Sequence, residues 1–185
     1  MLSQSYQDFE VIVYDNCSSD GSVDFLKSNF ADNKIKIITA EINSGFAGGN
    51  NEAFKYAIGD FIVLLNNDTI VETEWLSELV QCVSASDKIG MAQSLVLTEG
   101  VPLKYYEKNG TVNIFGHNIM EVFDVNENGI GEMFQVNGCS LIIKRDVLNK
   151  INGLFLNEYF AYAEDTFLSF KVKFAGYKII HNSKS

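Results

Sequence analysis

The segment most informative about the fold is NSGFAGGNNEAFKYAIGDFIVLLNNDT, residues 43–69. It begins with a glycine-rich loop, continues as a helix that we expect to end at Gly59, and closes with the apolar run FIVLL. A strand without polar positions is typical of one buried on both faces of a parallel sheet. The run then breaks into Asn66, Asn67 and Asp68. This stretch therefore predicts a loop, a helix and a buried strand that ends in polar side chains.

Strand and helix patterns alternate on both sides of this stretch. Upstream, EVIVYD and KIKIITA predict strands, with a short helix over residues 21–30 between them. Downstream, the sequence predicts an amphipathic helix over 73–85, strands over 89–97, 140–144 and 177–181, and a helix-rich segment over 159–176. Residues 98–135 predict only short strands and loops, and no linker interrupts the chain. We expect one α/β domain over residues 1–185, with a mainly parallel central sheet flanked by helices.

The composition limits the classes of function. The chain has 185 residues, of which 46% are hydrophobic, and a net charge of −10, so it can form a core but has no basic face for nucleic acid. Its three cysteines form no CxxC pair, which predicts reduced thiols in a cytosolic setting and no zinc site. We find no signal peptide, and no apolar run reaches the ~20 residues of a membrane span.

The segment VIVYDNCSSDGS, residues 11–22, has two interpretations. Three of its residues fall at ligand positions one, three and five of a calcium loop, but position twelve is Lys27 where a bidentate Glu is required. The preceding residues are β-branched and few, as in a strand. We therefore expect a strand that delivers Asp15 to a ligand, although Asp15 alone fits a turn residue equally well.

Polar side chains at strand ends predict a ligand site. Ligands of open α/β sheets bind beyond the carboxyl ends of the strands, where Asp15 and Asp68 are expected. Asn67 and Asp68 offer the oxygen ligands that Mg²⁺ or Mn²⁺ prefers. The alternative is that residues 66–69 only cap the next helix.

The loop GFAGGNN, residues 45–51, contains three glycines before a helix. Glycines allow a backbone to approach a ligand, and a helix N-terminus favours anions. The loop matches neither the P-loop nor GxGxxG, and it fits a plain structural turn equally well.

Glu164 and Asp165 lie within an aromatic-rich segment. Burial raises the pKa of a carboxyl group toward the working range of a base, whereas a helix N-terminus lowers it. The sequence leaves open which effect prevails, and two solvated acids on a helix remain the alternative.

In order and spacing, five segments resemble the family-2 glycosyltransferases of the GT-A fold, most closely a rhamnosyltransferase-like branch: QSYQDFEVIVYDNCSSDGS, NSGFAGGNNEAFKYAIGDFIVLLNNDT, VNGCSLIIKRDVL, INGLFLNEYFAYAED and KFAGYKI. The resemblance implies an inverting, metal-dependent enzyme of the hexosyltransferase type. Such an enzyme transfers a sugar from a nucleotide-diphosphate donor to a saccharide or lipid-linked acceptor in surface polysaccharide or glycan synthesis. It implies a cytoplasmic location that includes the inner face of the membrane.

The resemblance also implies residue roles. Asp165 is expected to be the general base, with Glu164 beside it. Asp68 is expected to bind the Mg²⁺ or Mn²⁺ ion. The donor is expected to contact Asp15, Gly45, Asn50, Asn51, Asn67 and Asp68.

The sequence departs from the family pattern at its N-terminus. The family has a further strand with a PTYN-like motif before the segment that matches SQSYQDFE. We therefore expect an incomplete domain with low activity. Members of the family commonly carry a later histidine that can reach the metal, and because His181 comes a few residues too early for it, we expect that ligand beyond Ser185. The alternative function is a non-catalytic nucleotide-sugar-binding module or an inactive fragment of such an enzyme.

Overall fold

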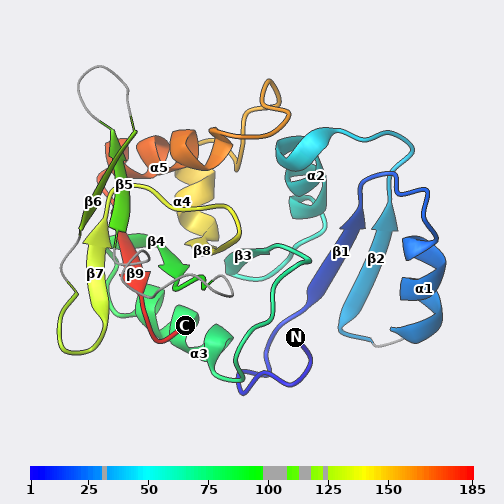
Figure 1. Ribbon diagram of the computed structural model, residues 1–185, viewed down its shortest axis with the longest axis horizontal. Helices are drawn as coiled ribbons and strands as arrows, with labels where there is room; N and C mark the ends of the chain where they lie inside the picture. The colour runs from blue at the N-terminus through cyan, green and yellow to red at the C-terminus, as the bar shows by residue number, and fades with distance from the viewer. Residues whose placement is uncertain (31–32, 98–107, 113–117, 123–124) are drawn as a thin grey trace.

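The computed structural model describes residues 1–30, 33–97, 108–112, 118–122 and 125–185, with backbone only for the two strands between 98 and 124. Figure 1 shows the arrangement of the elements. In chain order they are β1 (Val11–Asp15), α1 (Ser22–Asn29), β2 (Ile35–Thr39), α2 (Gly45–Phe54), β3 (Phe61–Leu65), α3 (Trp75–Ser84), β4 (Ile89–Ser94), β5 (Lys108–Val112), β6 (Asn118–Val122), β7 (Ile130–Met133), β8 (Ser140–Lys144), α4 (Arg145–Lys150), α5 (Glu164–Phe174) and β9 (Lys178–Asn182).

Five strands form the central sheet in the order β3-β8-β4-β9-β7. Only the β4–β9 pair is parallel, whereas β8 is antiparallel to both of its neighbours and β7 is antiparallel to β9. The α/β class is confirmed, but the expectation of a mainly parallel sheet is wrong for these five strands. The reason is that the buried apolar residues of β8, Leu141 to Ile143, give the same sequence pattern whichever way the strand runs.

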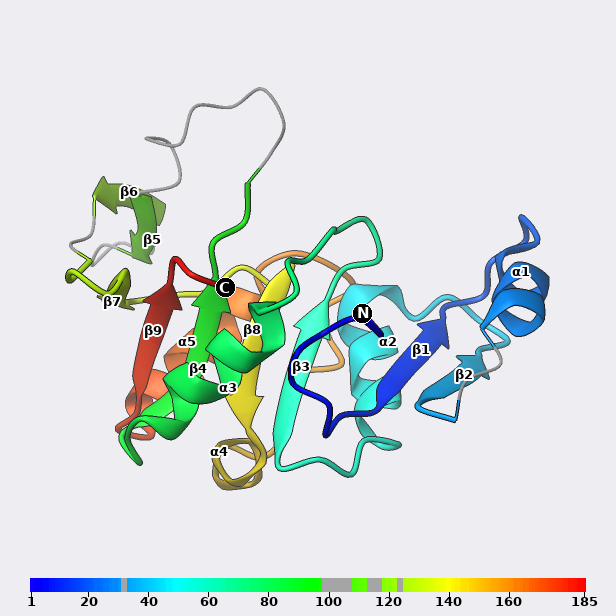
Figure 2. The ribbon, with the colours of Figure 1, turned by 90° about the horizontal axis from the view of Figure 1, so that it is seen from below.

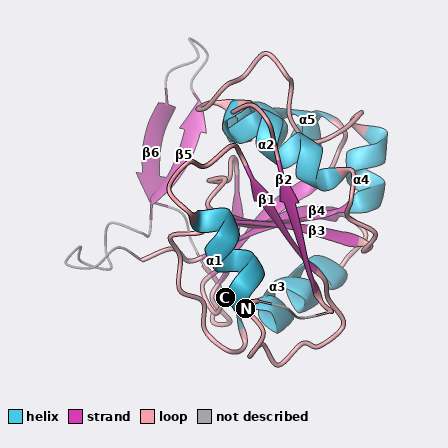
Figure 3. Cartoon of the chain, turned by 90° about the vertical axis from the view of Figure 1, so that its right-hand side faces the viewer, coloured by secondary structure: helices cyan, strands magenta, loops and turns pink. Residues whose placement is uncertain are grey.

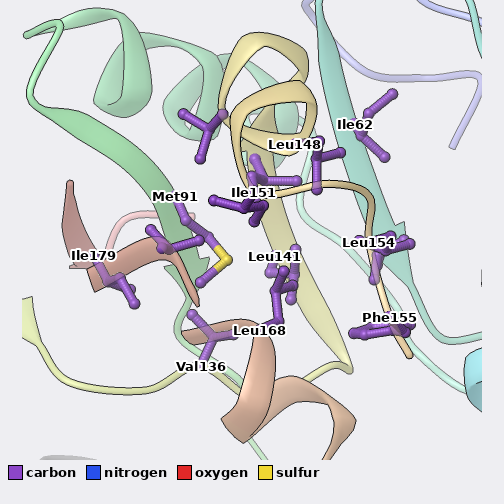
Figure 4. Packing of buried hydrophobic residues seen from close by; sticks show 14 of the residues in the cluster. Ile62, Met91, Val136, Leu141, Leu148, Ile151, Leu154, Phe155, Leu168 and Ile179 are labelled. Carbon is purple, nitrogen blue, oxygen red and sulfur yellow. The ribbon is translucent and has the colours of Figure 1, made fainter. Parts of the chain in front are cut away.

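Helices cover both faces of the strands. Figure 3 shows α2, α4 and α5 on one side and α3 on the other. The first core cluster combines the sheet with α4 and α5, and Figure 4 shows Leu141, Leu148 and Leu168 within it. The second cluster lies under α3, where Trp75 and Leu79 contribute the apolar face that the sequence predicts. No helix in the described part of the chain has both the length and the apolar character of a membrane span.

The N-terminal segment is attached to the start of α3 by Gln4. The side chain of Gln4 is 1% exposed, its Nε2 donates to the Glu72 carbonyl oxygen at 2.7 Å, and its Oε1 accepts from the Leu76 N–H at 2.9 Å. The N-cap residue of α3, Glu74, makes no side-chain capping bond. Gln4 therefore satisfies a backbone N–H that a helix start otherwise leaves unpaired.

The parallel pair β1–β2 stands apart from the central sheet. Within the described residues β1 pairs only with β2 and β3 pairs only with β8, so one edge of each strand is unpaired. Figure 2 shows these two strands beside each other, both pointing toward the same end of the molecule. A cavity of about 1450 Å³ is lined by every residue of both strands. Val11 to Tyr14 are consequently only half-buried despite their apolar composition.

Candidate active site

The carboxylate at the end of β1 is Asp15, as the sequence predicts. Its side chain is 8% exposed, and Oδ2 accepts a hydrogen bond from the Ser18 N–H at 3.0 Å. This bond closes the turn that ends the strand. Asp15 also lines the cavity between β1 and β3. It is thus a turn residue and a cavity residue at once.

Glycine is required at the first position of α2. Gly45 has φ +73°, and a Cβ atom there would lie 2.2 Å from the carbonyl oxygen of Phe160. Residues 45–51, which we expected to be a loop, are instead the first residues of α2, and the helix ends at Phe54 and not at Gly59. The segment near Phe160 approaches the helix backbone closely at Gly45. Gly45 and Asn50 nevertheless line the cavity as well, where they remain candidate donor contacts.

Asn51 does not line the cavity. Its Nδ2 donates to the Phe155 carbonyl oxygen at 3.0 Å and to Asn157 Oδ1 at 2.8 Å, and its Oδ1 accepts from the Phe155 N–H at 3.0 Å. These bonds join α2 to a segment more than 100 positions later in the chain. The structure thus gives Asn51 the role of anchoring the segment that leads into α5.

The polar end of β3 forms a turn. The Asn66 N–H donates to the Cys139 carbonyl oxygen at 2.9 Å, and Thr69 Oγ1 donates to the Asn66 carbonyl oxygen at 2.7 Å. Asn67 and Asp68 are exposed on this turn. Because α3 begins only at Trp75, the interpretation of residues 66–69 as its cap is wrong.

A short segment before β8 connects Asp68 with Asp165. Burial raises the pKa of the Cys139 thiol, and the negative charge of Asp68 raises it further. The adjacent Gly138 N–H donates to Asp165 Oδ2 at 3.1 Å. Gly138 thus binds Asp165, and Cys139 binds the turn that carries Asp68 through the Asn66 N–H, although the two acids are 97 positions apart in sequence.

The start of α5 has an unusual backbone. Tyr162 and Ala163 both have positive φ angles, 72° and 68°, which non-glycine residues rarely adopt. The helix begins only at Glu164, so the segment from residue 159 that we expected to be helix-rich starts as a turn. The turn leaves Asp165 in the first helical turn, where its Oδ1 accepts from the Thr166 N–H at 2.6 Å.

Glu164 is buried beside Asp165. It is 6% exposed, and its Oε2 has no hydrogen-bond partner among the residues that the structure describes. Burial raises the pKa of Glu164, and the charge of Asp165 raises it further. Burial therefore prevails over the helix N-terminus at this residue, and the alternative of a solvated helix acid is wrong for it.

The predicted residues divide into two neighbouring groups. Asp15, Gly45, Asn50 and Asn67 line the cavity, whereas Asn51, Asp68, Glu164 and Asp165 lie outside its lining. Phe46 links the groups, because it lines the cavity and because a Cβ atom on Gly138 would lie 3.1 Å from its ring. Asp165 is thus connected to the cavity through two residues in contact.

Two residues near the site were not predicted from the sequence. Gly138 holds Asp165 through its backbone N–H, and Asn16 binds the start of α2 through its side chain. The partners are 27 to 29 positions away in the chain. Contacts of that kind leave no periodic pattern that sequence analysis could detect.

Metal binding would depend on few protein atoms. No group of three or more His, Cys, Asp and Glu residues in the described ranges could hold an ion. The exposed oxygens of Asn67 and Asp68 fit a hard divalent cation. Mg²⁺ commonly binds through one or two carboxylates together with substrate phosphates and water, so this donor set is compatible with it.

A model of the family described as "Glycosyl transferase family 2" matches residues 1–151. The chain belongs to this family. Its members among curated proteins include the Escherichia coli UDP-Glc:alpha-D-GlcNAc-diphosphoundecaprenol beta-1,3-glucosyltransferase WfgD, which is 28% identical over 160 residues. That match covers 85% of this chain and 57% of the relative, so the chain spans little more than half of its length. The putative teichuronic acid biosynthesis glycosyltransferase TuaG of Bacillus subtilis is 36% identical over 37% of this chain and 27% of its own.

Solved structures confirm the fold. GalNAc-T7, with UDP, GalNAc and Mn²⁺, has a TM-score of 0.75 at 15% identity, covering 94% of this chain and 36% of its own. The mannosyltransferase PcManGT of Pyrobaculum calidifontis, with GDP-Man and Mn²⁺, has a TM-score of 0.71 at 18% identity, covering 98% and 48%. These are GT-A fold transferases, so the predicted GT-A fold is confirmed, with a mixed central sheet in place of the mainly parallel one that we expected.

Proposed function

We propose that this family-2 glycosyltransferase is an inverting, metal-dependent enzyme that transfers a hexose from a nucleoside-diphosphate donor to a hydroxyl of a saccharide or lipid-linked saccharide. The observation that carries the proposal is that Asp15, the start of α2 and Asn67 adjoin one cavity. Next to it, Gly138 binds Asp165 and contacts the cavity residue Phe46, and Cys139 binds the turn that carries Asp68. The named relatives in polysaccharide synthesis support the class of acceptor. Neighbours solved with UDP or GDP-Man and Mn²⁺ support the class of donor and ion.

The donor nucleotide would occupy the cavity end that Asp15 reaches. A buried carboxylate with one oxygen engaged by Ser18 can accept a hydrogen bond from a base N–H on its other oxygen. Gly45 and Asn50 would approach the same ligand from the start of α2. These residues bind and orient the donor, and they take no part in proton transfer.

Asp68, with Asn67 beside it, would hold Mg²⁺ or Mn²⁺ against the donor phosphates. When bound, the ion supplies Lewis-acid stabilisation of the negative charge on the departing nucleoside diphosphate. The exposed position of both side chains leaves room for the phosphate and water oxygens that complete the ion's coordination.

Asp165 would act as the general base. It takes the proton of the acceptor hydroxyl while that oxygen bonds to the anomeric carbon and the bond from carbon to phosphate oxygen breaks. A single displacement of this kind inverts the anomeric carbon. The Gly138 N–H holds one carboxylate oxygen of Asp165, which fixes the side chain for this task. Glu164, buried with a raised pKa, would shield the base from water.

The domain would require a further strand between β1 and β3 for full activity. The support for this part of the proposal is the pair of unpaired strand edges on the cavity, because buried backbone groups need hydrogen-bond partners. Met1 also lines that cavity. We expect the chain of residues 1–185 to have low transferase activity and an N-terminally longer form to have more. Full activity of residues 1–185 would contradict this.

Replacement of the base tests the proposal. In a form of the protein with measurable transfer, Asp165→Asn is expected to lower turnover by at least ~10², the usual scale of general base catalysis, while nucleotide affinity stays within about twofold. Asp146→Asn, at an exposed position of α4, is the matched control and should leave both values unchanged. Unchanged turnover in Asp165→Asn would exclude this residue as the base.

The second candidate function is a nucleotide-sugar-binding module without turnover. The separation of the β1–β2 pair from the central sheet favours it for residues 1–185 alone. Donor binding without transfer or hydrolysis, in a longer form as well, would identify this function. For either function we place the chain in the cytoplasm, at the inner face of the membrane when its acceptor is lipid-linked.

A further inference from the structure

The side chain of Asn16 uses its whole hydrogen-bonding capacity on the start of α2. Its Nδ2 donates to Asn43 Oδ1 at 3.0 Å and to the Gly45 carbonyl oxygen at 2.9 Å. Its Oδ1 accepts from the Ser44 N–H at 3.0 Å and from Ser44 Oγ at 3.2 Å. An amide offers two donors and one carbonyl oxygen with two lone pairs, so all four positions are filled.

The start of α2 needs such support from outside the helix. Its N-cap residue, Ser44, makes no side-chain capping bond, and three of the first five helix residues are glycines, which form helices poorly. Asn43 Oδ1 accepts from the Gly45 N–H at 2.9 Å, and Asn16 in turn holds that oxygen. A Cβ atom on Gly49 would lie 3.3 Å from Asn16 Nδ2, so the amide also packs against the helix.

Asn16 also follows Asp15 directly in the chain, and both residues line the cavity together with Gly45. The position of Asp15 and the position of the first turn of α2 are therefore fixed relative to each other by one side chain. We propose that Asn16 is a positioning residue, which holds the start of α2 in the place where the donor nucleotide binds. The inference rests on the proposed function and adds a residue that sets donor affinity without itself reacting.

Two measurements on the chain of residues 1–185 test this inference. The first is titration calorimetry with UDP, GDP and dTDP in the presence of Mn²⁺, and the second is amide hydrogen exchange over residues 43–49. The variant is Asn16→Ala. The matched control is Asn182→Ala, because the Asn182 amide also makes partly buried hydrogen bonds to the backbone, but on β9. It donates to the Glu78 carbonyl oxygen and accepts from the Lys184 N–H.

Both variants are expected to lower the melting temperature, since each removes partly buried hydrogen bonds. Only Asn16→Ala is expected to speed amide exchange over residues 43–49. It is also expected to weaken nucleotide binding by about tenfold, which corresponds to the net contribution of one to two hydrogen bonds. Asn182→Ala should bind within about twofold of the unchanged chain, because a general loss of stability does not alter the site.

Unchanged exchange or unchanged nucleotide affinity in Asn16→Ala would overturn the inference. Equal weakening in both variants would also overturn it, since the effect would then be one of stability alone. If the unchanged chain binds none of the three nucleotides, the proposed function fails instead, and the exchange result alone decides whether Asn16 holds α2.

Discussion

Strands β8 and β1 have similar apolar sequences and different surroundings. Leu141 to Ile143 of β8 are 0% exposed, because β3 and β4 pair with both edges and helices cover both faces. Val11 to Tyr14 of β1 are only half-buried, since β2 pairs with one edge and a cavity adjoins the other. Two strands of similar apolar composition can therefore differ in how far their side chains are buried, because the elements packed around each strand determine that burial.

The candidate donor-binding residues and the candidate base also lie in different surroundings. Asp15 and its partner Asn16 belong to the open side, at the end of the cavity that we propose for the donor nucleotide. Asp165 belongs to the closed side, where Gly138 and the helix start fix its carboxylate. Donor binding and proton transfer are therefore expected to depend on different parts of the molecule.

The largest expected effect is a difference in stability between alanine substitutions in β8 and in β1. Leu141→Ala removes a fully buried side chain from β8 and should lower the free energy of unfolding by about 2–5 kcal/mol. Val13→Ala acts at a half-buried position beside the cavity and should cost about 1 kcal/mol or less. Urea denaturation of both variants measures the two values. Equal costs would show that β1 is as well packed as β8.

The next effect concerns pH and the buried imidazole of β9. Burial lowers the pKa of His181 to about 4 from its ordinary 6.5. The unfolded chain therefore takes up a proton before the folded one, and stability is lost as the pH falls from 6.5 toward 4, by about 3 kcal/mol in total. Denaturation of the unchanged chain and of His181→Phe at pH 7 and pH 4 measures this effect. The free energy of unfolding should fall by about 3 kcal/mol less between the two pH values in His181→Phe than in the unchanged chain. The same pH dependence in the variant would mean that His181 is accessible to protons.

A smaller effect is expected at Gln4, which joins the N-terminal segment to α3. Gln4→Ala leaves the Glu72 carbonyl oxygen and the Leu76 N–H without this partner and should cost about 1–3 kcal/mol of stability. Gln81→Ala, at an exposed position on α3, is the control and should change stability by less than about 0.5 kcal/mol. A Gln4 variant as stable as the control would show that the N-terminal segment is not held in place.

The sequence predicted most elements of the fold because their patterns are local. The apolar run of β3 and the amphipathic face of α3 with Trp75 and Leu79 lie where they were expected, although only alternate residues of β3 are fully buried. The glycines that were expected in a loop before a helix form the start of α2 itself. The direction of β8 could not be predicted, since pairing partners far along the chain determine it. For the same reason the sequence did not show that Asn51 binds a segment near Phe155.

The site was predictable where a side chain follows a strand directly. Asp15 and Asn67 reach the cavity as expected from their place at strand ends. The pKa of Glu164 was not predictable, because it depends on which residues bury that carboxyl group and not on its sequence neighbours.

The central claim is that one donor site joins Asp15 and Asp68, with Asp165 beside it and not needed for binding. The most direct measurement is the melting temperature of the chain with UDP, GDP and dTDP, each with Mn²⁺, for the unchanged chain and for Asp15→Ala, Asp68→Ala and Asp165→Asn. A ligand of the native state raises stability by mass action, so one nucleotide should raise the melting temperature of the unchanged chain and of Asp165→Asn alike. The same nucleotide should raise it less in Asp15→Ala and in Asp68→Ala. No rise with any nucleotide, or equal rises in all four proteins, would contradict the account.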